Sequence, residues 1–174
     1  MIRNQWSNKV AEEWCDAAPQ TPADQALALR VYTSRLIGMD PDLVMHGGGN
    51  TSCKSVTTDL FGNDIEVLCV KGSGWDLGTI EAPGLPAVKL APLLELRSLD
   101  ALSDEEMVNI QRAYLVDSAS PNPSVETLLH AFLPHKFVDH THATPFLALA
   151  NLPHAGEVMA ELFGDSMVFV PYVM

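Results

Sequence analysis

The chain has 174 residues, of which 47% are apolar, and this length suits a single domain with a substantial core. Asp and Glu number 22 against 10 Lys and Arg, for a formal net charge of −12 at pH 7; this charge disfavours nucleic acid or an anionic membrane as the partner. No apolar run approaches the ~20 residues that span a bilayer, no signal peptide opens the chain, and the three cysteines form no disulfide or zinc pattern, so we expect a cytoplasmic protein.

The first half of the chain predicts a helix followed by a hairpin. Thr21-Pro22-Ala23-Asp24 combines a capping hydroxyl, a proline in the first turn and an early acid, so a helix is predicted from here to Gly38. From Thr51 to Val70 the residues are β-prone on either side of a turn at Gly62-Asn63-Asp64, which predicts two antiparallel strands.

The second half alternates between helices and strands. Ser103-Asp104-Glu105-Glu106 is a capping box for a helix through about Asp117. Further helices are predicted over 124–133, 145–150 and 156–163, and strands over 87–90, 137–142 and 167–170. This order of elements favours one three-layer α/β domain over residues 1–174, whose sheet is mixed, with both parallel and antiparallel pairs.

Two histidines that flank a single residue are the clearest candidates for chemistry. His140 and His142 point to the same side of an extended backbone, with Cα atoms about 7 Å apart, and neutral imidazoles at this spacing can share one zinc ion. On spacing alone they are equally explained as partly buried histidines bonded to carbonyls. Asp139 alternates to the other face and is interpreted as a solvated charge. His135 and His154, the other candidate ligands, are interpreted as solvated loop residues.

Glu126 is a candidate for proton transfer. It lies in the first turn of a predicted helix, where the helix dipole favours a carboxylate, so capping alone explains it. The sharper interpretation is an acid/base whose pKa is raised toward neutrality by the low dielectric near a substrate. His130, one turn later on the same face, is interpreted as a local contact of Glu126.

Two glycine-rich turns are candidates for binding phosphate. Glycine allows a backbone to approach a ligand closely and point successive N–H groups at it. Neither turn matches the phosphate loop or the dinucleotide fingerprint, and no Gly-x-Ser-x-Gly elbow supports a lipase-like site. The residues expected to bind phosphate or substrate here are Gly49, Asn50, Thr51, Ser73 and Gly74, with Lys71 adding positive charge.

Taken in order, these motifs resemble those of the class II aldolase/adducin family over nearly the whole chain. The motifs are Gly49-Asn50-Thr51-Ser52, Ser73-Gly74, Ser124-Val125-Glu126 and His140-Thr141-His142. The longer runs 70–77 and 123–132 are most similar to the N-terminal part of bacterial bifunctional rhamnulose-1-phosphate aldolase/short-chain dehydrogenase proteins, in which a separate dinucleotide-binding region follows.

The resemblance implies an α/β/α fold, a tetramer and a divalent metal, with zinc as the favoured ion. It implies retro-aldol cleavage of a sugar phosphate, a ketose 1-phosphate such as rhamnulose 1-phosphate, through a metal-stabilised enediolate. The implied roles are metal binding by His140 and His142, acid/base catalysis by Glu126, and phosphate binding by Asn50, Ser73, Gly74 and Ser124.

Two departures from the family pattern affect these expectations. Val125 replaces the second serine of the phosphate segment, which removes one hydroxyl from the site. A third histidine ligand would fall beyond Met174, so we expect a domain truncated on its C-terminal side that binds metal weakly by itself.

Two alternatives use the same fold differently. One is a non-catalytic, adducin-like interaction module, which the His-x-His pair and Glu126 disfavour because such a module does not need converging ligands. The other is an epimerase, dehydratase or decarboxylase of sugar phosphates, and nothing near Glu126 separates it from an aldolase.

Overall fold

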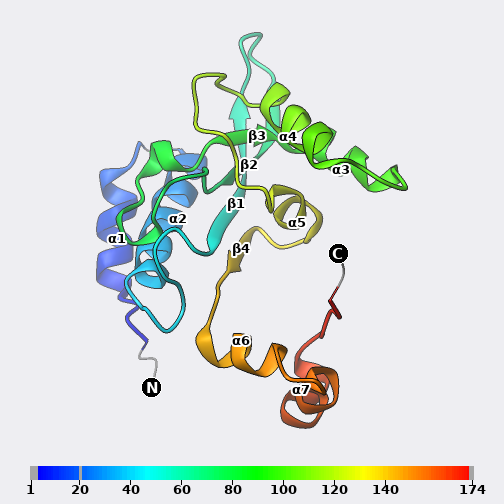
Figure 1. Cartoon of the computed structure of the whole chain (residues 1–174). Helices are drawn as coiled ribbons and strands as arrows, with labels where there is room; N and C mark the ends of the chain where they lie inside the picture. Colours follow the sequence, from blue (N-terminus) through cyan, green and yellow to red (C-terminus); the bar gives the residue numbers. More distant parts are fainter. Residues whose placement is uncertain (1–3, 20, 173–174) are drawn as a thin grey trace.

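The chain folds around one antiparallel sheet. The computed structural model describes residues 4–19 and 21–172. The sheet has the strand order β3-β2-β1-β4 (Figure 1), and its strands are β1 Asn50–Thr58, β2 Asp64–Val70, β3 Ala87–Lys89 and β4 Phe137–His140. The α/β class is confirmed, but the prediction of a mixed sheet is wrong in the described ranges, where every strand pair is antiparallel.

The missing parallel pairing has a local cause. Residues 167–170, predicted as the last strand, lie in irregular backbone after α7 and make no ladder with the sheet. An apolar run forms a strand only where its backbone groups reach a free sheet edge. The alternation of helix and strand therefore ends with β4, which runs antiparallel to β1.

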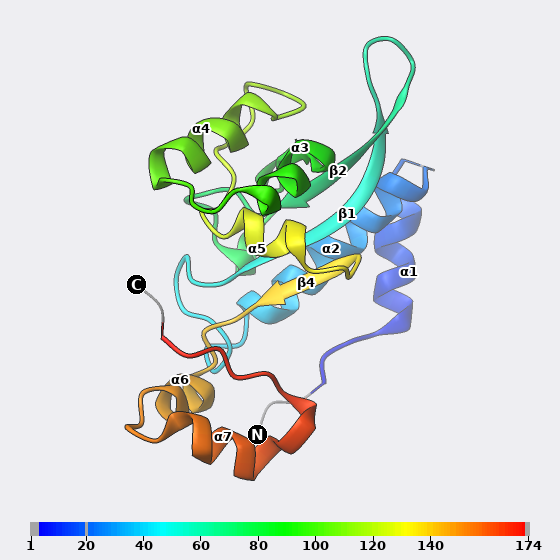
Figure 2. The same ribbon diagram turned by 90° about the vertical axis from the view of Figure 1, so that its right-hand side faces the viewer.

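Helices cover both faces of the sheet, as Figures 1 and 2 show. On one face lie α1 Asn8–Ala17 and α2 Pro22–Gly38; on the other lie α3 Leu90–Glu95, α4 Asp104–Ala113 and α5 Thr127–Phe132. The three layers expected from the sequence are therefore confirmed. The short 3-10 helices are Leu77–Thr79, Ala82–Gly84, Leu96–Ser98 and Gly164–Ser166.

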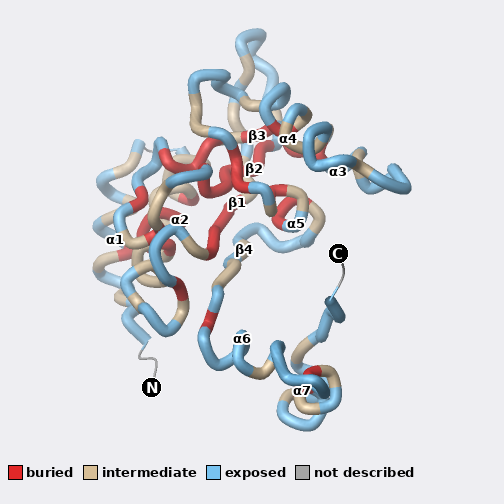
Figure 3. Tube along the Cα trace, in the orientation of Figure 1, coloured by how far each residue is buried: buried red, intermediate tan, exposed pale blue. Residues whose placement is uncertain are grey.

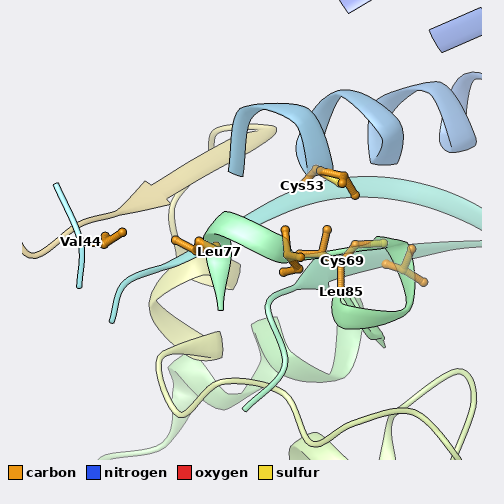
Figure 4. Close-up of a cluster of buried hydrophobic side chains, with 8 residues drawn as sticks. Val44, Cys53, Cys69, Leu77 and Leu85 are labelled. Atoms are coloured by element: carbon orange, nitrogen blue, oxygen red, sulfur yellow. The ribbon is translucent and has the colours of Figure 1, made fainter. Parts of the chain in front are cut away.

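The core follows the alternation of side chains along β2. Val67 and Cys69 pack against the α2 side, whereas Leu68 and Val70 pack against the α3 and α5 side. Figure 4 shows part of the first cluster, and Figure 3 shows that buried residues gather along β1 and β2. The sheet is thus buried on both faces, and this packing holds the backbone at its strand ends in place.

The predicted helices form, with shifted ends. Thr21 caps α2, and the Ser103–Glu106 capping box begins α4, as expected. The α5 helix begins at Thr127 rather than at 124, because the Ser124 N–H donates to Lys71 O in the segment that follows β2. Two helices, α1 and α3, were not predicted. No helix in the described ranges is long and apolar enough to cross a membrane.

The segment after β4 extends away from the layered body. It comprises α6 Thr144–Ala150 and α7 Ala155–Phe163, both close to their predicted bounds. In Figures 1 and 2 these two helices pack mainly on each other, and Figure 3 shows them largely exposed.

Candidate active site

A pocket at one end of the sheet gathers most of the predicted site residues. It has a volume of about 180 Å³ and lies where the glycine turn before β1, the turn after β2 and the turn before α5 meet. Its lining residues are Gly47, Gly48, Gly49, Asn50, Lys71, Gly72, Ser73, Gly74, Ser124, Val125, Glu126 and His142. Of the ten predicted residues, only Thr51 and His140 do not line it.

Strand register brings these segments together. Because β1 and β2 are antiparallel, the start of β1 meets the end of β2, and the Lys71 N–H donates to Thr51 O at 3.0 Å. The Ser124 N–H in turn donates to Lys71 O at 3.1 Å. On the other side of β1, Asn50 is directly opposite His140 of β4.

Asn50 is the centre of the polar contacts. It is 3% exposed, and its Nδ2 donates to Ser124 Oγ at 3.0 Å and to Glu126 Oε2 at 2.8 Å. Its Oδ1 lies 2.5 Å from His130 Nε2 and 3.3 Å from His140 Nδ1. One buried amide therefore connects the candidate acid/base to the candidate metal ligand.

Glu126 is ionised more readily than predicted. Burial raises its pKa, but hydrogen bonds from Ser124 and from its own backbone N–H, together with His140 and the Asn50 amide, outweigh burial and hold the pKa below its usual value. The rise toward neutrality that is expected next to a substrate is therefore not a property of the site by itself. A carboxylate that receives several hydrogen bonds stays charged.

His140 and His142 lie side by side, with ring centroids 4.9 Å apart. His140 is half-buried, and burial lowers its pKa despite the opposing effect of Glu126, so its imidazole is neutral at pH 7. His142 lies just past β4, with its N–H on Leu43 O at 2.9 Å. Two adjacent imidazoles fit a divalent ion as two of its ligands. The described residues contain no cluster of three or more metal-binding side chains.

The pocket is also rich in hydrogen-bond donors. In the described ranges, the N–H groups of Gly49, Gly74 and Val125 have no acceptor. Gly49 and Gly74 adopt φ of +65° and +84°, which turn the backbone toward the pocket. Lys71 Nζ donates to Gly47 O at 3.2 Å, and burial lowers its pKa although Asp76 and Glu126 oppose this. Free N–H groups beside an ammonium group form an anion site.

Two predicted roles do not match the observed contacts. Thr51 is fully buried, and its hydroxyl lies 2.7 Å from Ser34 Oγ, away from the pocket, because successive strand residues face opposite sides. Asp139, interpreted as a solvated charge, pairs with Arg30 Nη1 at 2.6 Å. Arg30 is 1% exposed, so this ion pair anchors β4 on α2.

Sequence reasoning also underestimated His130 and missed Ser52. His130 has no exposed surface, and its Nδ1 lies 2.8 Å from Ser52 Oγ. Ser52 follows Asn50 by two residues on the same face of β1. The spacing of His130 one turn after Glu126 was the available signal, but a helical spacing alone does not identify the partners on another strand.

Comparison with known proteins identifies the family. The model of the class II aldolase and adducin N-terminal domain matches residues 28–174. The chain belongs to this family. A solved structure, the N-terminal class II aldolase domain of a conserved protein from Thermoplasma acidophilum, is similar to this chain, with 39% sequence identity and a TM-score of 0.84. The match covers 99% of this chain and 75% of that chain.

A longer relative is known from Bacillus subtilis strain 168. The uncharacterized oxidoreductase YuxG is 44% identical over 143 residues, which cover 82% of this chain but 21% of YuxG. The name of that relative therefore describes a protein of which the shared region is a small part. Membership of the family supports an aldolase-type function in general, and class II aldolases generally use a divalent metal.

Proposed function

We propose that this chain is the aldolase-type part of a metal-dependent lyase that cleaves a sugar phosphate, a ketose 1-phosphate such as rhamnulose 1-phosphate. The observation that carries the proposal is the composition of the pocket. The pocket contains donors for an anion together with the Glu126 carboxylate, and the imidazoles of His140 and His142 lie side by side next to it.

The phosphate is held by the hydrogen-bond donors of the pocket. The N–H groups of Gly49, Gly74 and Val125 have no acceptor among the described residues, and Lys71 adds a positive charge. Ser73 and Ser124 lie in the same lining; the Ser124 hydroxyl donates its proton to Glu126, so the Ser73 hydroxyl is the one available to an anion. Such groups bind an anion despite the overall charge of −12, because the nearest groups set the local field.

The divalent ion, with zinc as the favoured one, is held by His140 and His142 as two of its ligands. The neutral ring of His140 provides a lone pair of the kind that this requires, and the ring of His142 lies beside it. A divalent ion bound there would supply Lewis-acid polarisation of the ketose oxygens and would stabilise the negative charge that develops as the carbon–carbon bond breaks.

Glu126 transfers the proton. In a retro-aldol reaction the bond between C3 and C4 breaks, the C4 hydroxyl loses its proton and becomes an aldehyde, and C3 gains a proton. An ionised Glu126 accepts the first proton and then returns it. Its lowered pKa keeps it in the basic form before substrate binds, and Asn50 and Ser124 hold the carboxylate in position.

The decisive experiment is Glu126→Gln in the protein that carries this chain. We expect turnover of a ketose 1-phosphate to fall at least about 100-fold, because a general acid/base is lost, while Zn²⁺ binding is unchanged. Glu105→Gln, at an exposed site on α4, is the control and should retain full activity. Unaltered cleavage by Glu126→Gln would rule out the proposed role.

The same assay separates the alternatives that share the fold. Product analysis distinguishes an aldehyde and a ketose phosphate fragment from the single organic product of an epimerase or dehydratase and from the CO₂ that a decarboxylase releases. A protein that binds Zn²⁺ but converts none of a panel of sugar phosphates would instead favour the adducin-like module. By family resemblance, we further propose that the protein is a homotetramer, and that it is cytoplasmic. Sedimentation of the purified protein tests the oligomeric state.

A further inference from the structure

His130 is a buried titratable residue that the proposed reaction does not use. It lies in α5 with no exposed surface, yet both of its ring nitrogens have a partner. Nδ1 is 2.8 Å from Ser52 Oγ, and Nε2 is 2.5 Å from Asn50 Oδ1. A ring held at both nitrogens inside a packed core has a fixed orientation.

The contacts of Asn50 determine which end of its amide faces His130. Its Nδ2 lies 2.8 Å from Glu126 Oε2, and an ionised carboxylate only accepts hydrogen bonds. The amide oxygen therefore faces His130. Because that oxygen also only accepts, His130 Nε2 must carry a proton whether the ring is neutral or charged. In the neutral ring, Nδ1 accepts the hydroxyl proton of Ser52.

The same amide oxygen decides the tautomer of His140. It lies 3.3 Å from His140 Nδ1, and this contact is favourable only when Nδ1 carries the proton. In a neutral ring the lone pair is then on Nε2. An imidazole binds a metal through its lone pair, and the hydrogen bond made by the other nitrogen determines which nitrogen is available.

We infer that His130 is a positioning residue: together with Ser52 it locks the amide of Asn50, which holds His140 with the proton on Nδ1 and leaves Nε2 free to bind a ligand. A reversed amide would place its oxygen against the Glu126 carboxylate and its N–H groups against two ring nitrogens. The consequence for metal binding rests on the proposed function, whereas the tautomer itself does not.

The tautomer of His140 is the direct test, measured by long-range proton–nitrogen NMR of the imidazole rings at mildly alkaline pH. His140→Asn identifies the relevant signals. In the wild-type chain we expect the proton on Nδ1 alone. In His130→Phe, which removes both ring nitrogens, we expect the tautomer with the proton on Nε2 to appear as well. In His130→Gln, whose amide can replace the lost donor, we expect the wild-type tautomer.

Two further variants keep the test decisive. Leu93→Ala, in the apolar cluster on the same side of the sheet, loses stability without touching the network and should retain the wild-type tautomer. Ser52→Ala removes only the group that holds His130 Nδ1, and it carries the test if His130→Phe does not fold. A His140 tautomer unchanged in His130→Phe, or in Ser52→Ala when that variant carries the test, overturns the inference.

Titration with Zn²⁺ alone provides a second readout that needs no turnover. We expect the Kd to rise about tenfold or more in His130→Phe and to recover in His130→Gln, because hydrogen bonds to a ligating histidine contribute that much to metal affinity. Equal Kd values in all variants would overturn the link between the amide and metal binding. Neither readout depends on Glu126→Gln, so failure of the proposed reaction is distinguishable from failure of this inference.

Discussion

At the residue scale, the site is a set of buried polar groups that satisfy one another. Asn50 can begin a central strand while almost fully buried because both ends of its amide are hydrogen-bonded. Its partners come from the turn before α5, from α5 and from β4, so no single segment of the sequence contains the network. Losing one partner would leave another buried group unsatisfied, at a cost of about 1–3 kcal/mol.

His130 should make stability depend on pH. Burial first, and then His140, lower its pKa to about 4 from the ordinary 6.5. The unfolded chain therefore binds a proton below pH 6.5, whereas the folded chain binds it only below about 4. The contribution of His130 to the free energy of unfolding is fully present above pH 6.5, and it falls by about 3 kcal/mol as the pH falls to 4. Urea unfolding at both ends of this range measures the loss.

His130→Gln provides the comparison for that measurement. The glutamine side chain retains a donor and an acceptor but does not titrate. The free energy of unfolding of this variant should therefore fall by about 3 kcal/mol less than that of the wild-type chain on acidification. Carboxylates such as Glu126 titrate in both proteins and cancel in the difference. Identical acid losses would mean that His130 does not have a depressed pKa in the folded state.

At the element scale, the turn before β1 depends on one close approach. Gly49 has φ +65°, and a Cβ there would lie 2.6 Å from the carbonyl oxygen of His140 and 2.7 Å from Val44 Cγ1. The turn thus fits against β4 only with glycine. This close approach brings the glycine-rich motif next to the His-x-His motif, although Asn50 and His140 are 90 residues apart in the sequence.

Two glycine variants separate this packing effect from backbone strain. Gly49→Ala should lower the free energy of unfolding by at least about 2 kcal/mol. The new methyl group would clash with the backbone, and alanine disfavours a positive φ. Gly74→Ala has φ +84° but nothing within 4 Å of its Cβ, so it should cost only about 1 kcal/mol. Chemical unfolding of the two variants measures the difference, and equal losses would contradict the close contact.

At the scale of the whole molecule, one ion pair joins two layers near the site. Arg30 of α2 is buried, reaches across β1 to Asp139 of β4, and also donates to Ser52 O at 3.4 Å. Its Nε has no partner in the part of the chain that the structure describes. The strand that carries His140 is therefore tied to the helix layer on the opposite side of the sheet.

Asp139→Asn should lower the unfolding free energy by about 2 kcal/mol, because it leaves a buried guanidinium without its counter-charge. Asp139 is half exposed, so the loss stays below that of a fully buried pair. Glu13→Gln breaks an exposed pair with Lys9 on α1 and should change stability by less than about 0.5 kcal/mol. Thermal unfolding of both variants checks this, and equal small effects would show that Arg30 does not need Asp139.

Much of the architecture was predictable because local signals coincide with tertiary packing. The caps at Thr21 and Ser103 formed as expected, and the hairpin turn formed over 59–63 rather than 62–64, because Asp64 already belongs to β2. The run 167–170 did not form a strand, because strand formation requires a partner that sequence periodicity cannot supply. The residues around the pocket were found from their motifs, but the hydroxyl of Thr51 and the charge of Asp139 were misplaced, since their partners lie on α2.

The sequence by itself determined the class of this protein and the residue types of its site, because glycine turns, helix caps and paired histidines act over a few neighbours. Only the tertiary structure decided how those groups are used. It placed Asn50 among Ser124, Glu126, His130 and His140, and it lowered the pKa of Glu126 where burial alone predicted a rise. Hydrogen bonds between distant segments set these properties, and they exist only after the layers have packed.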